Sequence, residues 1–148
     1  MKILAIDPAQ RTGFCLDVNS GKFGFKDFKL KRDESFGFKL LQFKKFLKDL
    51  IETEGVELVA FERPSGHHAA AVQSHSKFIA MIEEYCAEHG IPTKGFSAKE
   101  IKSHATGNGN ANKVMMIAAA NKKFNQGVED DNVADAIWIW DLAQSEAV

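Results

Sequence analysis

The chain has 148 residues, of which 45% are hydrophobic and 26% are charged, and its formal net charge is −1. This length is sufficient for one buried core and too short for two, so we expect a single domain over residues 1–148. The near-neutral charge disfavours a protein that coats nucleic acid, and the lack of a signal-peptide pattern and of a run of about 18 apolar residues predicts a soluble, cytoplasmic protein without a membrane span.

The first part of the sequence has the patterns of antiparallel strands. Residues 2–6 form a mainly apolar run that predicts a central strand, and residues 13–17 predict its hairpin partner after a turn over residues 8–12. Phe23, Phe25 and Phe28 alternate with polar side chains, which predicts a third, half-exposed strand.

From Ser35 the spacing of apolar residues changes to three and four, which predicts an amphipathic helix that ends near Gly55. A strand over residues 58–61, a long helix over residues 69–89 and a strand over residues 91–96 follow. Three more helices are expected over about 98–104, 113–124 and 132–143. This order predicts an α/β fold with a mixed five-stranded sheet flanked by helices.

Four carboxylates are the strongest functional signal. Asp7 and Glu62 each follow a buried strand, and ligands gather outside strand ends in such sheets. Asp131 and Asp135 are four residues apart, a spacing that puts both side chains on one face of a helix. Gathered carboxylates repel each other unless hard cations neutralise them, and Mg²⁺ or Mn²⁺ suits such a site. We therefore predict a metal site.

Several other polar residues allow more than one interpretation. Gly107 and Gly109 let a backbone approach a phosphate, and Lys113 adds charge at a helix start, but a flexible loop capped by Asn112 has the same composition. Lysines crowd residues 22–48, either as a phosphate-binding surface or as an ordinary solvated face. The histidines at 67, 68 and 75 are expected in a solvated loop, and Cys15 and Cys86 as reduced core thiols.

Four segments, taken in order, resemble the motifs of RuvC-type Holliday-junction resolvases within the RNase H-like superfamily. Residues 6–8 with 12–13 are similar to the first motif, residues 61–64 to the second and residues 131–136 to the C-terminal acidic motif. Residues 101–102 and 107–113 are similar to the glycine-rich segment that precedes a helix in these enzymes. The resemblance spans nearly the whole chain and implies an RNase H-like fold.

The acidic motif points to one branch of that family. Bacterial members place the two acids three residues apart, which would pair Asn132 with Asp135, whereas the spacing of four is similar to mitochondrial, poxviral and some phage members. The resemblance therefore favours a phage-type member, located in the host cytoplasm if a phage encodes it. Asp130 is an alternative to Asp131.

The resemblance implies a metal-dependent endonuclease that cuts four-way or other branched DNA in recombination and repair and leaves 5′-phosphates. It implies two Mg²⁺ ions per active site, with Mn²⁺ as an alternative, held by Asp7, Glu62, Asp131 and Asp135. Paired cuts imply a homodimer, and we expect its contact on the helix over residues 69–89. The residues expected to contact DNA are Lys102, Gly107, Gly109, Lys113 and Arg63.

Two other functions stay open at this point. A related RNase H-like nuclease could act on structured RNA, because contacts to the 2′-hydroxyl are not readable in a sequence. A catalytically silent junction-binding module is disfavoured because all four acids are present. An ATPase half of the actin or sugar-kinase type would need a second domain that this chain lacks.

Overall fold

The computed structural model describes residues 1–66 and 69–147, so His67 and His68 lie outside the described residues. One sheet contains the five strands β1 (Ile3–Asp7), β2 (Arg11–Asp17), β3 (Lys22–Asp27), β4 (Leu58–Glu62) and β5 (Thr93–Phe96), in the order β3-β2-β1-β4-β5. The pairs β1–β2 and β2–β3 are antiparallel, and β1–β4 and β4–β5 are parallel. The predicted mixed five-stranded sheet is confirmed.

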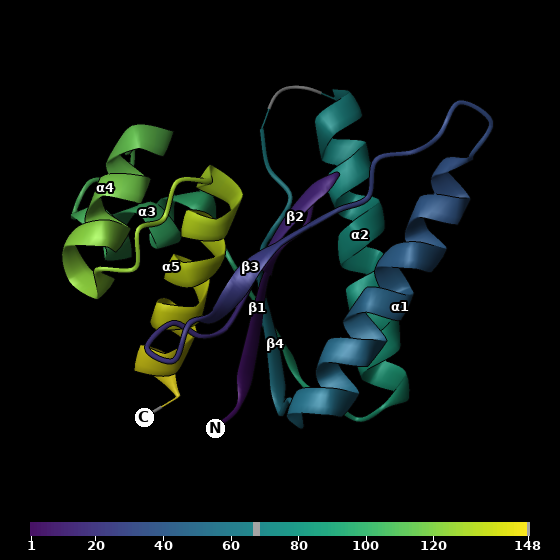
Figure 1. Cartoon of the computed structure of the whole chain (residues 1–148), viewed down its shortest axis with the longest axis horizontal. Coiled ribbons are helices and arrows are strands. Elements are labelled where there is room, and N and C mark those ends of the chain that lie inside the picture. Colours follow the sequence, from purple (N-terminus) through teal and green to yellow (C-terminus); the bar gives the residue numbers. More distant parts are fainter. Residues whose placement is uncertain (67–68, 148) are drawn as a thin grey trace.

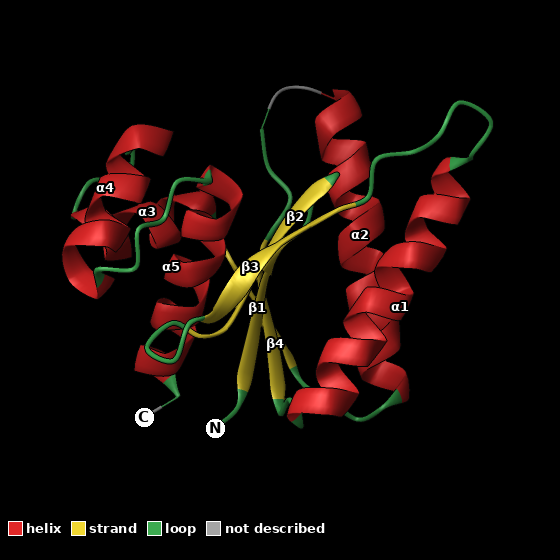
Figure 2. Ribbon diagram, viewed as in Figure 1, coloured by secondary structure: helices red, strands yellow, loops and turns green. Residues whose placement is uncertain are grey.

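Helices cover both faces of this sheet (Figures 1 and 2). Helices α1 (Phe36–Glu54) and α2 (Ala69–Glu88) lie on one side, and α3 (Ala98–Thr106), α4 (Lys113–Phe124) and α5 (Asp131–Glu146) lie on the other. Among the described helices, none combines the length and apolar character that crossing a bilayer requires.

Local sequence explains where these helices begin and end. Ser35 caps α1 by accepting a hydrogen bond from the Phe38 amide at 3.1 Å, and Ser97 with Glu100 forms a capping box at α3. Gly55, with a left-handed backbone, ends α1, which is the stop that the sequence predicts. Several predicted boundaries differ slightly from the structure. β1 ends at Asp7, β2 begins at Arg11 inside the expected turn because Thr12 pairs with Lys26, β5 begins at Thr93, and α5 continues to Glu146.

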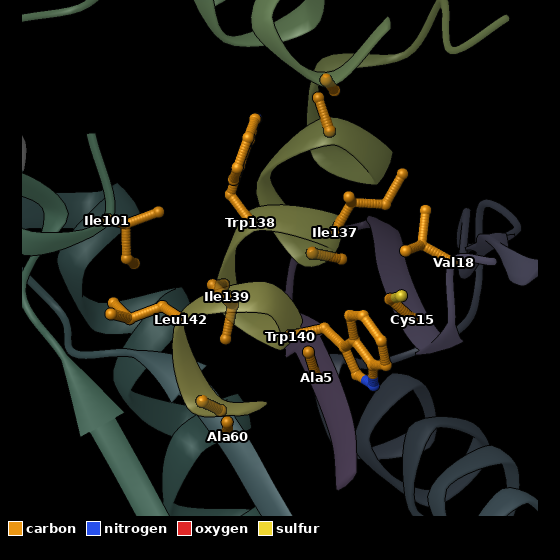
Figure 3. Close-up of a cluster of buried hydrophobic side chains, with 14 of the residues drawn as sticks. Ala5, Cys15, Val18, Ala60, Ile101, Ile137, Trp138, Ile139, Trp140 and Leu142 are labelled. Carbon is orange, nitrogen blue, oxygen red and sulfur yellow. The ribbon is translucent and has the colours of Figure 1, made fainter. Parts of the chain in front are cut away.

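The central strand divides the core into two layers. Leu4 and Ile6 pack with the buried faces of α1 and α2, whereas Ile3 and Ala5 pack with α5 on the opposite face of the sheet. Figure 3 shows the second layer, in which Trp138 of α5 points away from the sheet, toward residues of α3 and α4 such as His104 and Met116. Because β1 is covered on both faces, its four preceding residues are buried and only the acid at its end is partly exposed.

Two predictions about single residues have different outcomes. Cys15 and Cys86 are buried free thiols, as expected. His75 lies within α2, so its predicted place in a solvated loop is wrong. The apolar stripe of α2 turns this part of the helix toward the sheet, and the Nε2 atom of His75 is buried.

Candidate active site

Two of the four acids stand side by side at one edge of the sheet. Asp7 is the last residue of β1, and Glu62 is the last residue of β4. These strands are parallel neighbours in which Ile6 is paired with Phe61, so the next residue of each strand reaches the same edge. The pairing therefore brings together two acids that are 55 positions apart in the sequence.

Helix α5 brings the other two acids to the same place. Asp131 is its first residue and Asp135 lies about one turn later. The first turn of α5 lies directly on β2, because a Cβ atom at Gly13 would collide with the backbone of Asn132 and come within 3.0 Å of the Val133 nitrogen. Gly13 is also the β2 partner of Asp7. A residue without a side chain at position 13 thus allows the acidic end of α5 to approach Asp7.

The charges of these side chains act on one another. Burial raises the pKa of Asp7 well above its ordinary value of 3.8, and the charges of Asp135, Glu62 and Asp131 raise it further. Burial also raises the pKa of Asp135 to about 7, with added repulsion from Glu62 and Asp131. For Glu62, burial raises the pKa, whereas nearby Lys102 lowers it. The acids form one cluster of negative charge that is poorly compensated by the protein.

The cluster offers only oxygen ligands, which suit a hard divalent cation such as Mg²⁺. The raised pKa values of Asp7 and Asp135 fit such a role, because burial and, to a smaller extent, repulsion between the acids disfavour their charged forms, and a bound cation would favour them. Within residues 1–66 and 69–147, however, no three acidic, histidine or cysteine side chains stand in the arrangement of a formed metal centre. The four acids are gathered, and their role as ligands stays a prediction.

Asp130 and Asp131 have different surroundings. Asp130 is the N-cap of α5: its Oδ1 accepts hydrogen bonds from the amides of Asn132 at 2.8 Å and Val133 at 3.1 Å, and its Oδ2 accepts one from Arg11 at 3.0 Å. Asp131 lies 3.5 Å from the amine of Lys113. Both oxygens of Asp130 are thus committed to the fold, which favours Asp131 as the functional acid.

The basic residues predicted to contact DNA fall into two groups. Lys102 and Lys113 lie at the acids, because Lys102 lowers the pKa of Glu62 and Asp135, and Lys113 pairs with Asp131. Arg63 is instead engaged within the protein: its guanidinium donates to the Gly95 carbonyl at 2.8 Å and pairs with Glu100 at 3.3 Å.

The composition of the glycine-rich segment, residues 107–113, has structural reasons. Gly107 ends α3 with a left-handed backbone, and its N–H donates to the Ser103 carbonyl at 2.8 Å. A Cβ atom at Gly109 would lie 2.8 Å from Cγ of Lys99, so the loop packs tightly on α3. Asn112 caps α4, as the alternative interpretation of this segment expects. The structure contains no nucleic acid, so contact of this loop with DNA stays a prediction.

Comparisons with known proteins come from structure alone, since no protein-family model and no curated protein matches the chain. The structure of T. thermophilus RuvC in complex with Holliday junction substrate aligns with a TM-score of 0.73 and 16% identity over 94% of this chain and 90% of that one. A second T. thermophilus RuvC structure aligns with a TM-score of 0.69 and 17% identity over 94% and 90%. The yeast mitochondrial Holliday junction resolvase aligns with a TM-score of 0.64 and 16% identity over 93% and 75%. This chain therefore has the α/β fold of RuvC-type resolvases.

Proposed function

We propose that this chain is a RuvC-type endonuclease that resolves four-way and related branched DNA in recombination and repair. The observation that carries the proposal is the convergence of Asp7, Glu62, Asp131 and Asp135 from three separate segments on one edge of the sheet. A shared fold alone does not establish an activity. The acid cluster adds a specific chemistry, because phosphodiester hydrolysis uses carboxylates of this kind to hold divalent metal ions.

In this proposal the four acids hold two Mg²⁺ ions, with Mn²⁺ as an alternative. Bound ions of this kind would supply activation of the attacking water and stabilisation of charge on the leaving oxygen of a phosphodiester. Asp7 is assigned the shared position, because Glu62, Asp131 and Asp135 all act on its pKa. Glu62 would then help Asp7 to hold one metal ion, and the two acids of α5 would help it to hold the other.

Positive side chains beside the acids would position the substrate. Lys102 and Lys113 lie close enough to offset the carboxylate charge, and both could hold a phosphate group that approaches the cluster. Gly107 and Gly109 shape the loop between these two lysines. Arg63 is assigned a contact with DNA farther from the acid cluster, because its guanidinium already binds the Gly95 carbonyl in β5 and Glu100 in α3.

Resolution of a four-way junction needs two cuts, one on each of two strands, so we infer that two copies act together as a homodimer. The inferred contact includes the face of α2 that points away from the sheet. In-line attack of water at the phosphorus, with the 3′ oxygen as the leaving group, would leave a 5′-phosphate and a 3′-hydroxyl at both nicks. A two-fold axis between the protomers would then match the symmetry of the junction.

The test is a cleavage assay with end-labelled four-way, three-way and linear duplexes, and with a structured RNA, each with and without Mg²⁺. Paired nicks in the four-way junction that require Mg²⁺ and disappear in Asp7→Asn would support the proposal. Cutting of the RNA alone would replace it with a ribonuclease function, and binding of the junction without cutting under either Mg²⁺ or Mn²⁺ would indicate a silent binding module.

A further inference from the structure

A second concave site borders the acid cluster on the side of α1 and α2. It is a pocket of about 390 Å³ lined by residues 8–10, by Phe36 and Lys39 of α1, and by a segment of α2 that includes Ser74, His75 and Phe78. Residue 8 follows Asp7 directly, so the pocket begins where the acid cluster ends. Its volume is within the range of pockets that hold small ligands.

Lys39 gives this pocket a positive charge. The residue is only 9% exposed, no acidic residue lines the pocket, and within the described part of the chain no ion pair involves Lys39. Its amine lies 5.2 Å from the centroid of the Phe36 ring, and the amine of Lys77 lies 4.6 Å from the same centroid. The side chain thus places a positive charge at the pocket, and an anionic ligand there could form an ion pair with it.

The rest of the lining suits a flat, polar ring. The Phe36 and Phe78 rings pack with centroids 5.7 Å apart and supply apolar surface. His75 also lines the pocket, and its Nε2 atom is buried and has no hydrogen-bond partner in the described part of the chain. Buried polar atoms are rarely left unpaired in proteins, and a shift of the ring toward the pocket would let this nitrogen pair with a ligand.

We propose that this pocket receives one nucleotide of the strand that is cut, next to the phosphodiester at the acid cluster. Lys39 contacts the phosphate of that nucleotide, and His75 and Phe36 contact its base. This inference rests on the proposed nuclease function and adds a source of selectivity. A base leaves the stack at low cost where strands branch and at higher cost in a continuous duplex, so the pocket favours branched DNA.

The experiment removes the charge of one DNA phosphate at a time. In the Asp7→Asn variant, which leaves the DNA uncut, binding is measured for junctions that carry a single neutral methylphosphonate at each position near the nick. One position should weaken binding about tenfold. After the further change Lys39→Met, the same methylphosphonate should have no additional effect, because the two changes remove the same contact. An abasic nucleotide at that position should weaken binding through loss of the base contacts.

Lys48→Met is the matched control, because Lys48 is exposed on the same helix and does not line the pocket. In the Lys48→Met variant the methylphosphonate should still weaken junction binding about tenfold. Circular dichroism checks that Lys39→Met is folded, and Lys39→Gln replaces it in the assay if it is not. If junctions are bound and cut but no position couples to Lys39, the pocket proposal is wrong and the nuclease function stands.

If branched DNA is neither bound nor cut, the nuclease function fails and the pocket is tested separately. Deoxynucleoside monophosphates are then titrated while the His75 ring resonances are followed by NMR. Saturable shifts in the wild type that are lost in Lys39→Met would support a nucleotide pocket, whereas unchanged resonances would overturn it.

Discussion

Replacing Asp135 with asparagine should make the metal-free protein more stable at pH 8. Burial and neighbouring acids raise the pKa of Asp135 to about 7 in the folded protein, against an ordinary value of 3.8. The protonated form is therefore favoured by folding. The stability that this preference contributes is complete below about pH 4 and is lost as the pH rises through about 7.

The size of the effect follows from that difference. About three pH units between the folded and unfolded pKa correspond to a loss of about 4 kcal/mol at pH 8. Asparagine has a similar shape and no charge, so Asp135→Asn should recover most of this loss. For a chain of this length, about 1 kcal/mol shifts Tm by about 2 to 4 °C, which predicts an increase on the order of 10 °C.

The assay is thermal unfolding followed by circular dichroism in buffer with EDTA, at pH 4 and at pH 8. At pH 4 the variant and the wild type should unfold at nearly the same temperature, because the carboxyl group is already protonated in the fold. Asp33→Asn, at an exposed acid in the loop before α1, makes the same charge change and should leave Tm nearly unchanged at both pH values. A variant that is no more stable at pH 8, or equally stabilised at both pH values, would refute the reasoning.

Four further outcomes are expected. Asp7→Asn should keep its affinity for a four-way junction in a gel-shift assay but lose Mg²⁺-dependent cutting by at least about a hundredfold, since it removes the proposed shared ligand. Gly13→Ala should lower cutting strongly, because its methyl group would push α5 away from β2, whereas Gly24→Ala, with ordinary contacts at 3.4 Å, should cut normally. Lys113→Ala should reduce the salt dependence of junction binding by about one unit of slope, and an unchanged slope would mean that the loop is structural. Added Mg²⁺ should raise Tm at pH 8 in the wild type and less so in Asp135→Asn, as checked by the same thermal scans.

Much of the fold could be predicted because local patterns dominate it. The apolar runs that precede Asp7 and Glu62 are short, buried strands. The antiparallel strands β2 and β3 and then helix α1 lie between them, an order that returns β4 parallel to β1. The spacing between Asp131 and Asp135 likewise places both acids on one helical face. These features depend on neighbouring residues, which a single sequence displays directly.

Other features depend on contacts between distant residues, which no local pattern reveals. The approach of Asn132 to Gly13 joins positions 119 apart, and the engagement of Asp130 as a cap depends partly on Arg11. Lys39 shares a helical face with Phe43 and Leu47, and its charge alone would suggest exposure to solvent, but it is buried in the folded chain. The sequence therefore indicates which acids matter and leaves open what surrounds them.

Helix α5 both carries two acids and supplies one layer of the core, and this affects when the protein becomes active. During synthesis the segments that hold Asp7 and Glu62 leave the ribosome well before α5 does. A nascent chain therefore has an incomplete set of carboxylates until α5 docks on β1 and β2. Under the proposed nuclease function, cutting of DNA would therefore begin only after α5 has docked.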